Sequence, residues 1–243
     1  SLAKVFTIMA SRFKVPSPPP TETLPLKSPR GATLATRIWP VAEPKALLLC
    51  VHGAGWHSGY FDELAAYLNK QNIFVVAYDV VCHGYSDPEP GAPEGSIYVH
   101  EFEDLVEDVW EAASWAYLKL GQCEGLKDED SRKIPLFLLG ESFGGPQVLS
   151  AALYPGMDRS ISIRGVICLG AALQTAKEIL PPPFVIKIVL FLSKYYPKLV
   201  TPLDTESSFD EAFGDKEWAK VCRSDPKVKT KIKMTLAVGA STL

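Results

Sequence analysis

The chain has 243 residues, of which 47% are apolar and 22% charged, as in an ordinary globular protein with one sizeable core. Its net charge of -3 offers no basic stripe that could displace counterions from phosphates, so nucleic acid is not expected as a partner. Five dispersed cysteines fit reduced thiols better than a disulfide framework, and no apolar run reaches the ~18 residues of a membrane span.

The first 31 residues differ in composition from the rest of the chain. They carry five basic residues against one acid, and they contain the proline-rich run Pro16–Pro20. A basic, acid-poor segment of this kind is typical of a disordered linker, and the end of an organelle transit peptide is the alternative. Residues 1–31 are therefore interpreted as a leader that precedes the first folded domain.

After the leader, short apolar runs alternate with helical patterns, which is the rhythm of a mostly parallel sheet. Thr33–Trp39 is predicted to be an edge strand, and Ala46–Val51 is a near-continuous apolar run of the kind buried on both faces. Ser58 is predicted to cap a helix that ends at Asn69, and Ile73–Tyr78 is the next strand.

The same rhythm continues to residue 172. Residues 82–98 are rich in Gly, Pro, Ser and acids and are predicted to form a loop. Beyond it, apolar residues recur at i, i+3, i+4 and i+7 over Phe102–Leu120, which predicts a long amphipathic helix. A strand over 134–139, a helix to about Tyr154 and a strand over Arg164–Gly170 complete a predicted core of residues 32–172.

Residues 173–235 break this rhythm. Phe184–Leu192 is an apolar segment that follows three prolines, and the polar stretches Ser207–Trp218 and Asp225–Met234 are helix-prone. We interpret the region as an inserted helical cap. Because short apolar runs fit helix and strand alike, a further buried element at Phe184–Leu192 is the alternative. Residues 236–243 are assigned to a truncated end.

The stretch Gly140-Glu141-Ser142-Phe143-Gly144-Gly145 directly follows the apolar run of a predicted strand and opens a predicted helix. This is the context of a G-x-S-x-G nucleophile elbow. A turn from strand to helix within one residue strains the backbone of the nucleophile, and side chains at Gly140 and Gly144 would collide across it. Ser142 is therefore the predicted nucleophile.

A second motif, His52-Gly53-Ala54-Gly55, immediately follows the strand that ends at Val51. Backbone N–H groups at such a loop, and at the residue after the nucleophile, form an oxyanion hole, which here predicts Ala54 and Phe143 as the two donors. Losing one such donor typically costs ~3 kcal/mol in the transition state. A glycine-rich turn without a ligand is the alternative for this loop alone.

The histidines do not indicate a second catalytic site or a metal site. His83 lies in a sharp turn that explains it structurally, and a Cys82/His83 nucleophile pair is disfavoured because adjacent residues in an extended chain point to opposite sides. His52 and His57 lack the i, i+4 helical spacing of a zinc-binding helix. The sequence predicts neither a metal site nor a cofactor.

Together these motifs resemble one group of enzymes. His52–Gly55 with His57-Ser58, the turn His83–Ser86, and Gly140–Gly145 are similar to the monoacylglycerol lipase group of α/β hydrolases, which carry a serine aminopeptidase S33 (hydrolase 4) domain. The segments Pro181–Pro183 and Lys194–Lys198 resemble plant-type members, including caffeoylshikimate esterase. The resemblance covers about residues 33–235 and implies an α/β-hydrolase fold: a mostly parallel sheet with flanking helices and an inserted helical cap.

The resemblance implies a serine hydrolase that cleaves a monoacylglycerol-like or other lipophilic carboxylic ester through an acyl-enzyme. An S33-type peptidase and an inactive, ligand-binding relic of the fold are the alternatives. We expect a small-molecule acyl ester as partner, a cytoplasmic location, and peripheral membrane contact through the apolar face of the cap. Residues from the loop, the elbow and the cap are expected to contact the substrate: His52, Gly53, Gly55, Glu141, Phe184 and Ile188.

The order of the catalytic residues raises a further expectation. In the resembled family the triad Asp and His follow the serine, but all four histidines here precede Ser142, and the four cap aspartates do not match the family's acid. His57 could in principle replace the missing base, but this is disfavoured because His57 lies near the loop that is predicted to form the oxyanion hole. We therefore expect the last strands of the fold and both triad partners to be missing from this chain, the chain alone to be inactive, and about 60 to 90 further residues to follow Leu243.

Overall fold

The computed structural model describes residues 26–27, 30–123, 131–154, 161–173, 182–200, 213 and 215–241. Its centre is a five-stranded sheet in the order β3-β5-β4-β6-β7. The strand bounds are β3 Thr36–Trp39, β4 Ala46–Val51, β5 Ile73–Tyr78, β6 Leu136–Glu141 and β7 Ile163–Leu169. β3 pairs antiparallel with β5, and the other pairs are parallel. The short strands β1 Leu26–Lys27 and β2 Thr33–Leu34 form a separate antiparallel pair.

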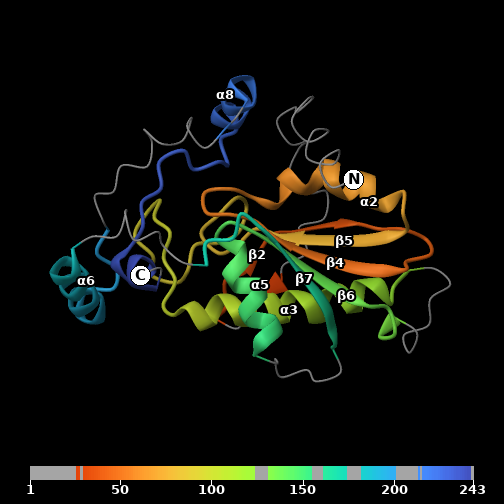
Figure 1. Ribbon diagram of the computed structural model, residues 1–243, viewed down its shortest axis with the longest axis horizontal. Coiled ribbons are helices and arrows are strands. Elements are labelled where there is room, and N and C mark those ends of the chain that lie inside the picture. The colour runs from red at the N-terminus through yellow and green to blue at the C-terminus, as the bar shows by residue number, and fades with distance from the viewer. Residues whose placement is uncertain are drawn as a thin grey trace.

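Helices cover both faces of the sheet (Figure 1). On one face lie the single 3₁₀ turn η1 Ser58–Phe61 and the helix α2 Asp62–Asn69, and on the other lie α3 Phe102–Leu120 and α5 Gly144–Leu153. Alternate residues of β4 point to opposite layers: Leu47 and Leu49 join the core beneath α3 and α5, whereas Leu48 and Cys50 join the core beneath α2. This two-sided burial explains why the central strands are nearly continuous apolar runs.

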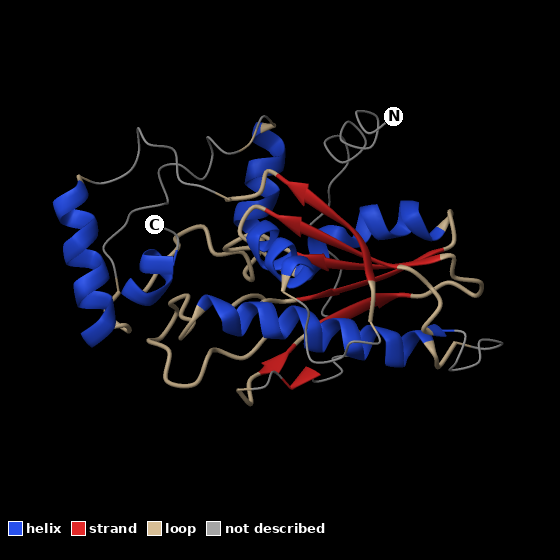
Figure 2. Cartoon of the chain, turned by 60° about the horizontal axis from the view of Figure 1, so that its bottom comes forward, coloured by secondary structure: helices blue, strands red, loops and turns tan. Residues whose placement is uncertain are grey.

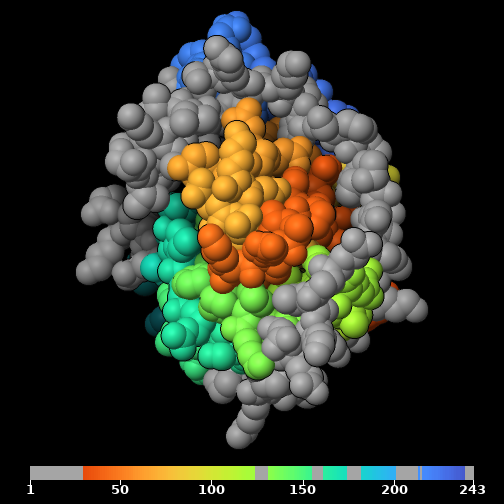
Figure 3. Space-filling view, turned by 90° about the vertical axis from the view of Figure 1, so that its right-hand side faces the viewer, coloured from red at the N-terminus to blue at the C-terminus, as the bar shows by residue number. Residues whose placement is uncertain are grey.

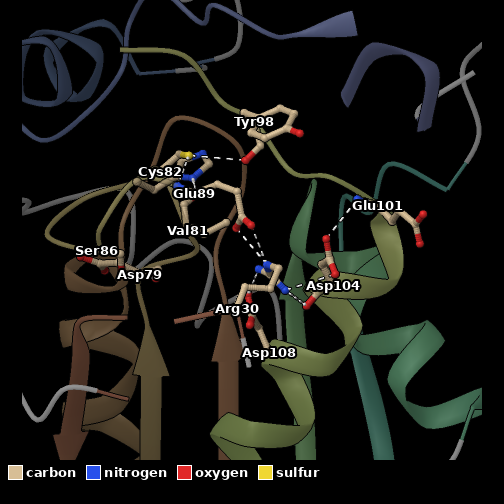
Figure 4. A network of polar contacts seen from close by, with 11 residues as sticks. Arg30, Asp79, Val81, Cys82, Ser86, Glu89, Tyr98, Glu101, Asp104 and Asp108 are labelled. Atoms are coloured by element: carbon tan, nitrogen blue, oxygen red, sulfur yellow. Dashed lines mark hydrogen bonds and ion pairs between the residues drawn. The ribbon is translucent and has the colours of Figure 1, made fainter. Parts of the chain in front are cut away.

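A buried ion-pair network ties the segment before β2 to α3 (Figure 4). The Arg30 guanidinium contacts Glu89 at 2.9 Å and Asp108 at 3.0 Å, and it donates to the carbonyl oxygen of Asp104. Asp104 also belongs to a capping box with Glu101 that begins α3. The first described residues of the domain are thus fixed to its longest helix.

In the part of the region after β7 that the structure describes lie the helices α6 Pro183–Tyr195, α8 Lys216–Ser224 and α9 Leu236–Ser241. α6 packs against α9, and the arrowheads of the parallel strands point toward the side of the molecule on which both helices lie (Figure 2). Isolated bridges join Ile97 to Met234 and Val200 to Thr235, so the loop before α3 holds the end of this region. Figure 3 views the opposite side, where surface atoms coloured orange, green and teal show that early, middle and later parts of the described core meet.

Most predicted elements are confirmed, and Ala46–Val51, Ile73–Tyr78 and Phe102–Leu120 are elements with these same bounds. The predicted edge strand Thr33–Trp39 is divided: Thr36–Trp39 lies at the edge of the sheet as β3, whereas Thr33–Leu34 pairs with β1. Phe184–Leu192 is helical rather than a strand, and α6 has no buried residue, so the alternative of a buried element is wrong. Among the described helices, none combines the length and apolar character needed to cross a membrane.

Two predictions need correction. Ser58 does not cap α2, because its hydroxyl donates to Asp79 and His57 instead caps the preceding 3₁₀ turn. Asp225–Met234 is not a helix: α8 ends before Asp225, whose extended backbone is what a residue preceding proline prefers. The predictions for residues 1–25, 174–181 and 207–212 fall outside the described residues.

Candidate active site

The turn that is predicted to be a nucleophile elbow lies between β6 and α5. Ser142 has φ +46°, a left-handed conformation that side-chain-bearing residues adopt at a cost, and its side chain is exposed. The elbow is bonded to the end of β7 and to the chain just beyond it, because the Ser142 N–H donates to Leu169 O (2.9 Å) and the Ala172 N–H donates to Ser142 O (3.0 Å). These two backbone hydrogen bonds help to hold Ser142 in its left-handed conformation at the end of β6.

Close backbone packing explains the glycines of the elbow. A methyl group at Gly140 would collide with the carbonyl of Gly144, and one at Gly144 would collide with the Val51 carbonyl at the end of β4. Only residues without a side chain allow α5 to begin this close to two strands. The glycines of the motif are therefore required by the fold around Ser142.

The oxyanion loop, defined as residues 52–57, lies directly against the elbow. A methyl group at Gly53 would be 3.1 Å from Ser142 Cβ, so the two backbones are in close contact. Within the described residues, neither the Ala54 N–H nor the Phe143 N–H donates a hydrogen bond to another residue. Two unused donors beside a serine can stabilise the negative charge of a tetrahedral intermediate.

His52 positions this loop from within the core. Its Nε2 accepts the Val80 N–H (2.9 Å), so the proton is on Nδ1, which donates to Gly53 O (2.7 Å). Burial lowers the pKa of His52 to about 4, although Asp79 opposes the effect, and the ring is therefore neutral at pH 7. Since both ring nitrogens bind backbone, this geometry favours a positioning role, and substrate contact by His52 stays a prediction.

Asp79, at the end of β5, organises the turn on the other side of the loop. Its carboxylate accepts the N–H of Ser58 (2.7 Å), the Ser58 hydroxyl and the N–H of Tyr85 (2.8 Å). Gly84 packs so closely on this carboxylate that a side chain there would collide with it. Sequence reasoning assigned no role to Asp79; its place immediately after a buried strand was the available signal.

His83 is a structural residue, as predicted. Its Nδ1 lies 2.9 Å from Val81 O, its ring meets that of His52 edge-on at 5.2 Å, and burial lowers its pKa to about 3. The neighbouring Cys82 thiol accepts the Glu89 N–H and contacts Tyr98 O instead of pairing with His83. The described contacts therefore give no support to a Cys82/His83 nucleophile pair.

No histidine of the described residues reaches the Ser142 hydroxyl by a hydrogen bond. His57 is bonded to Asp225 and Gly59, and His100 lies near the Tyr98 hydroxyl. Because the nitrogens of His57 are engaged elsewhere, its disfavoured role as a substitute base gains no support. The described part of the chain also holds no cluster of three or more residues suited to a metal ion.

The other predicted substrate contacts fall into two groups. Glu141, half-buried at the end of β6, adjoins the loop: burial raises its pKa, and the Gly53 backbone partly offsets the rise. Gly55 has φ +83° and packs on the segment after α8. Phe184 and Ile188 are exposed on α6, away from the sheet (Figure 1), so the structure does not bring them to the elbow.

Comparison with known proteins gives one family and a consistent set of relatives. The family model described as serine aminopeptidase S33 matches residues 42–242. Monoglyceride lipase of Homo sapiens is 36% identical over 150 residues, and that of Rattus norvegicus is 34% identical over 149. Each match covers 60% of this chain and 44% of the relative, so the chain spans less than half the length of these curated relatives.

Solved structures extend the likeness to the fold. A soluble variant of monoglyceride lipase from Saccharomyces cerevisiae, solved with a substrate analog, superposes with a TM-score of 0.66 at 22% identity, covering 95% of this chain and 69% of that one. The monoacylglycerol lipase of Paleococcus ferrophilus gives 0.62 at 22% identity, covering 86% and 68%. Together with the family match, these likenesses confirm the predicted α/β-hydrolase architecture.

Proposed function

Since the chain belongs to the serine aminopeptidase S33 family of α/β hydrolases, we propose that the protein is a serine hydrolase of a lipophilic carboxylic ester, with a monoacylglycerol as the model substrate. The observation that carries the proposal is the exposed, left-handed Ser142 beside two N–H groups that have no partner among the described residues. A strained serine that faces free donors is suited to acyl transfer.

In the proposed reaction, Ser142 Oγ attacks the ester carbonyl and its proton passes to a general base. The Ala54 and Phe143 N–H groups stabilise the oxyanion, the alcohol leaves with a proton, and water then releases the acid from the acyl-enzyme. The engaged histidines of the described residues supply no such base, so activity has to be measured on the full-length gene product.

We further propose that α6 brings the protein to its substrate as a peripheral membrane contact in the cytoplasm. Phe184, Ile188 and Phe191 are exposed on this helix, Lys187 lies between the first two in sequence, and Lys194 follows Phe191. Exposed aromatic and aliphatic side chains with flanking lysines fit the interfacial region of a bilayer. Free cysteines among the described residues are compatible with a reducing compartment.

The test is hydrolysis of p-nitrophenyl and monoacylglycerol esters by the full-length gene product. Ser142→Ala is expected to lower kcat by a factor on the order of 10⁴ or more. Ser150→Ala, on the outer part of α5, is the matched control and should hydrolyse both esters like the parent. Undiminished hydrolysis by Ser142→Ala would refute the assigned nucleophile.

Two further measurements separate the alternatives. An aminoacyl amide substrate hydrolysed faster than either ester would favour the S33-type peptidase. A ligand that raises Tm without any turnover, together with no labelling of Ser142 by a fluorophosphonate, would favour the ligand-binding relic.

A further inference from the structure

The oxyanion loop is contacted on its outer side by a distant part of the chain. The Lys229 N–H donates to Gly55 O at 2.8 Å. A methyl group at Gly55 would lie 2.8 Å from Lys229 O and 3.3 Å from the Ile232 side chain. We call residues 225–232 the brace segment. Its backbone packs directly on the loop that carries Ala54.

A second bond joins the two segments through buried side chains. His57 Nδ1 accepts the Gly59 N–H (3.2 Å), so the ring proton is on Nε2 and donates to Asp225 Oδ2 at 2.9 Å. Only 3% of the His57 side chain and 5% of the Asp225 side chain are exposed. A charge-assisted hydrogen bond removed from water in this way is stronger than one at the surface.

The Asp225 carboxylate is itself held in place. Its Oδ1 accepts the Lys227 N–H (2.8 Å), and its Oδ2 also accepts the Tyr60 hydroxyl (3.3 Å). One oxygen thus fixes the turn after α8, while the other faces the loop. Asp225 has no freedom to follow His57 if the loop moves.

Ring contacts beside the pair widen the contact area. Trp56 lies 5.7 Å from Phe213 and Tyr60 lies 5.6 Å from Trp218, measured between ring centroids. The Lys227 ammonium lies 4.3 Å from the centre of the Tyr85 ring, which faces His57. Gly55, Trp56, His57 and Tyr60 thus all contact residues beyond 212.

We propose that His57 and Asp225 are a positioning pair for the reaction assigned above, on which this inference rests. The pair and the Lys229–Gly55 bond hold the oxyanion loop against Ser142, so that the Ala54 N–H points to the place where negative charge develops. A misplaced oxyanion donor weakens the transition state more than it weakens the bound substrate. Loss of the pair is therefore expected to lower kcat and leave KM nearly unchanged.

Asp225→Asn in the full-length gene product is the sharpest test. The amide keeps the size of the carboxylate, but it faces three donors, His57 Nε2–H, the Tyr60 hydroxyl and Lys227 N–H, with a single acceptor oxygen. In either amide orientation at least one N–H donor faces an NH₂ group. We expect kcat to fall about tenfold, which corresponds to ~1.4 kcal/mol, with KM within about twofold of the parent.

A double-mutant cycle and hydrogen exchange complete the test. His57→Gln should lower kcat similarly, and adding it to Asp225→Asn should cost little more, because either change alone breaks the pair. Amides of residues 54–59 should exchange faster in Asp225→Asn while those of β5 do not. Glu217→Gln is the control, since this exposed α8 side chain pairs with Lys220 and, among the described residues, forms no hydrogen bond or ion pair with His57 or Asp225.

Additive effects of the two substitutions, or parental kcat and exchange in Asp225→Asn, would overturn the proposal. The exchange measurement does not depend on turnover. A protein that hydrolyses nothing would therefore refute the proposed function, while faster exchange at residues 54–59 would still support the brace, and unchanged exchange would refute it.

Discussion

The left-handed backbone of Ser142 is expected to lower the free energy of unfolding, and this effect can be measured separately from activity. A left-handed backbone costs an L-residue roughly 1–2 kcal/mol, whereas glycine adopts it freely. We expect Ser142→Gly to have a free energy of unfolding about 1 kcal/mol higher than Ser142→Ala, because both remove the hydroxyl but only glycine relieves φ +46°. Urea denaturation of both variants measures the difference.

Ser150→Gly and Ser150→Ala form the matched control pair. Ser150 lies in the helical interior of α5, where glycine is about 1 kcal/mol less favourable than alanine. The order of stability should therefore reverse between the two positions. The same order at both positions would mean that the elbow stores no strain at Ser142.

For individual residues, a local sequence motif could be recognised before the structure, whereas a bond between distant residues could not. Ser142, Gly53 and the proposed donors Ala54 and Phe143 could be named as candidates from the sequence, because the motif that suggests them involves neighbours within a few residues. The His57–Asp225 pair joins positions 168 residues apart, and no local pattern announces such a bond. Asp79 was visible as a polar residue after an apolar strand, but its three bonds come from the folded turn.

Among the helices, α6 offers the clearest test of the proposed membrane contact. We expect the double variant Phe184→Ser and Phe191→Ser to bind phosphatidylcholine vesicles at least about tenfold more weakly than the parent, because burying each phenyl ring contributes roughly 1.5–3 kcal/mol. Co-sedimentation over a range of lipid concentrations gives the partition coefficient.

Leu118→Ser is the control for this experiment. Leu118 is also an exposed apolar residue, but it lies on α3, a helix that packs on the sheet. Its substitution should leave vesicle binding unchanged. Equal weakening by Leu118→Ser, or parental binding by the double variant, would place the membrane contact elsewhere or remove it.

Elements were predictable where burial and periodicity agree. β4, β5 and α3 match their expected bounds, since each buries a pattern that continues without interruption to its end. The prediction of a helix over Asp225–Met234 was wrong. It rested on the polar, helix-prone composition of the segment, whereas Pro226 favours an extended backbone at Asp225. Ser58 looked like an N-cap, but tertiary contact with Asp79 redirected its hydroxyl.

The stability of the whole molecule should depend on pH through Asp108. Burial raises the pKa of Asp108 to about 6, although Arg30 opposes the rise. Because this pKa lies above the value in an unfolded chain, about 3.9, the folded state holds the proton more tightly. The resulting contribution to stability is fully present below about pH 4 and is lost as the pH rises through about 6.

Comparison with Asp108→Asn isolates this effect, because the amide does not titrate while the other ionisable groups stay the same. The free energy of unfolding of the parent, minus that of Asp108→Asn, should increase as the pH falls from 7 to 5. Urea denaturation at pH 7, 6 and 5 provides the three values. A difference that stays constant, or shrinks toward pH 5, would contradict the raised pKa.

The two edges of the sheet differ, and the difference matters for handling the protein. β3 is short, but β7 is the longest strand of the sheet, and among the described residues nothing pairs with its outer side. Ile167 and Cys168 are exposed on it. An uncovered parallel strand with apolar side chains is a template on which another copy's backbone can add. Where the outer side of β7 stays uncovered, edge-to-edge growth is therefore expected, and it would lower solubility without any fault in the core.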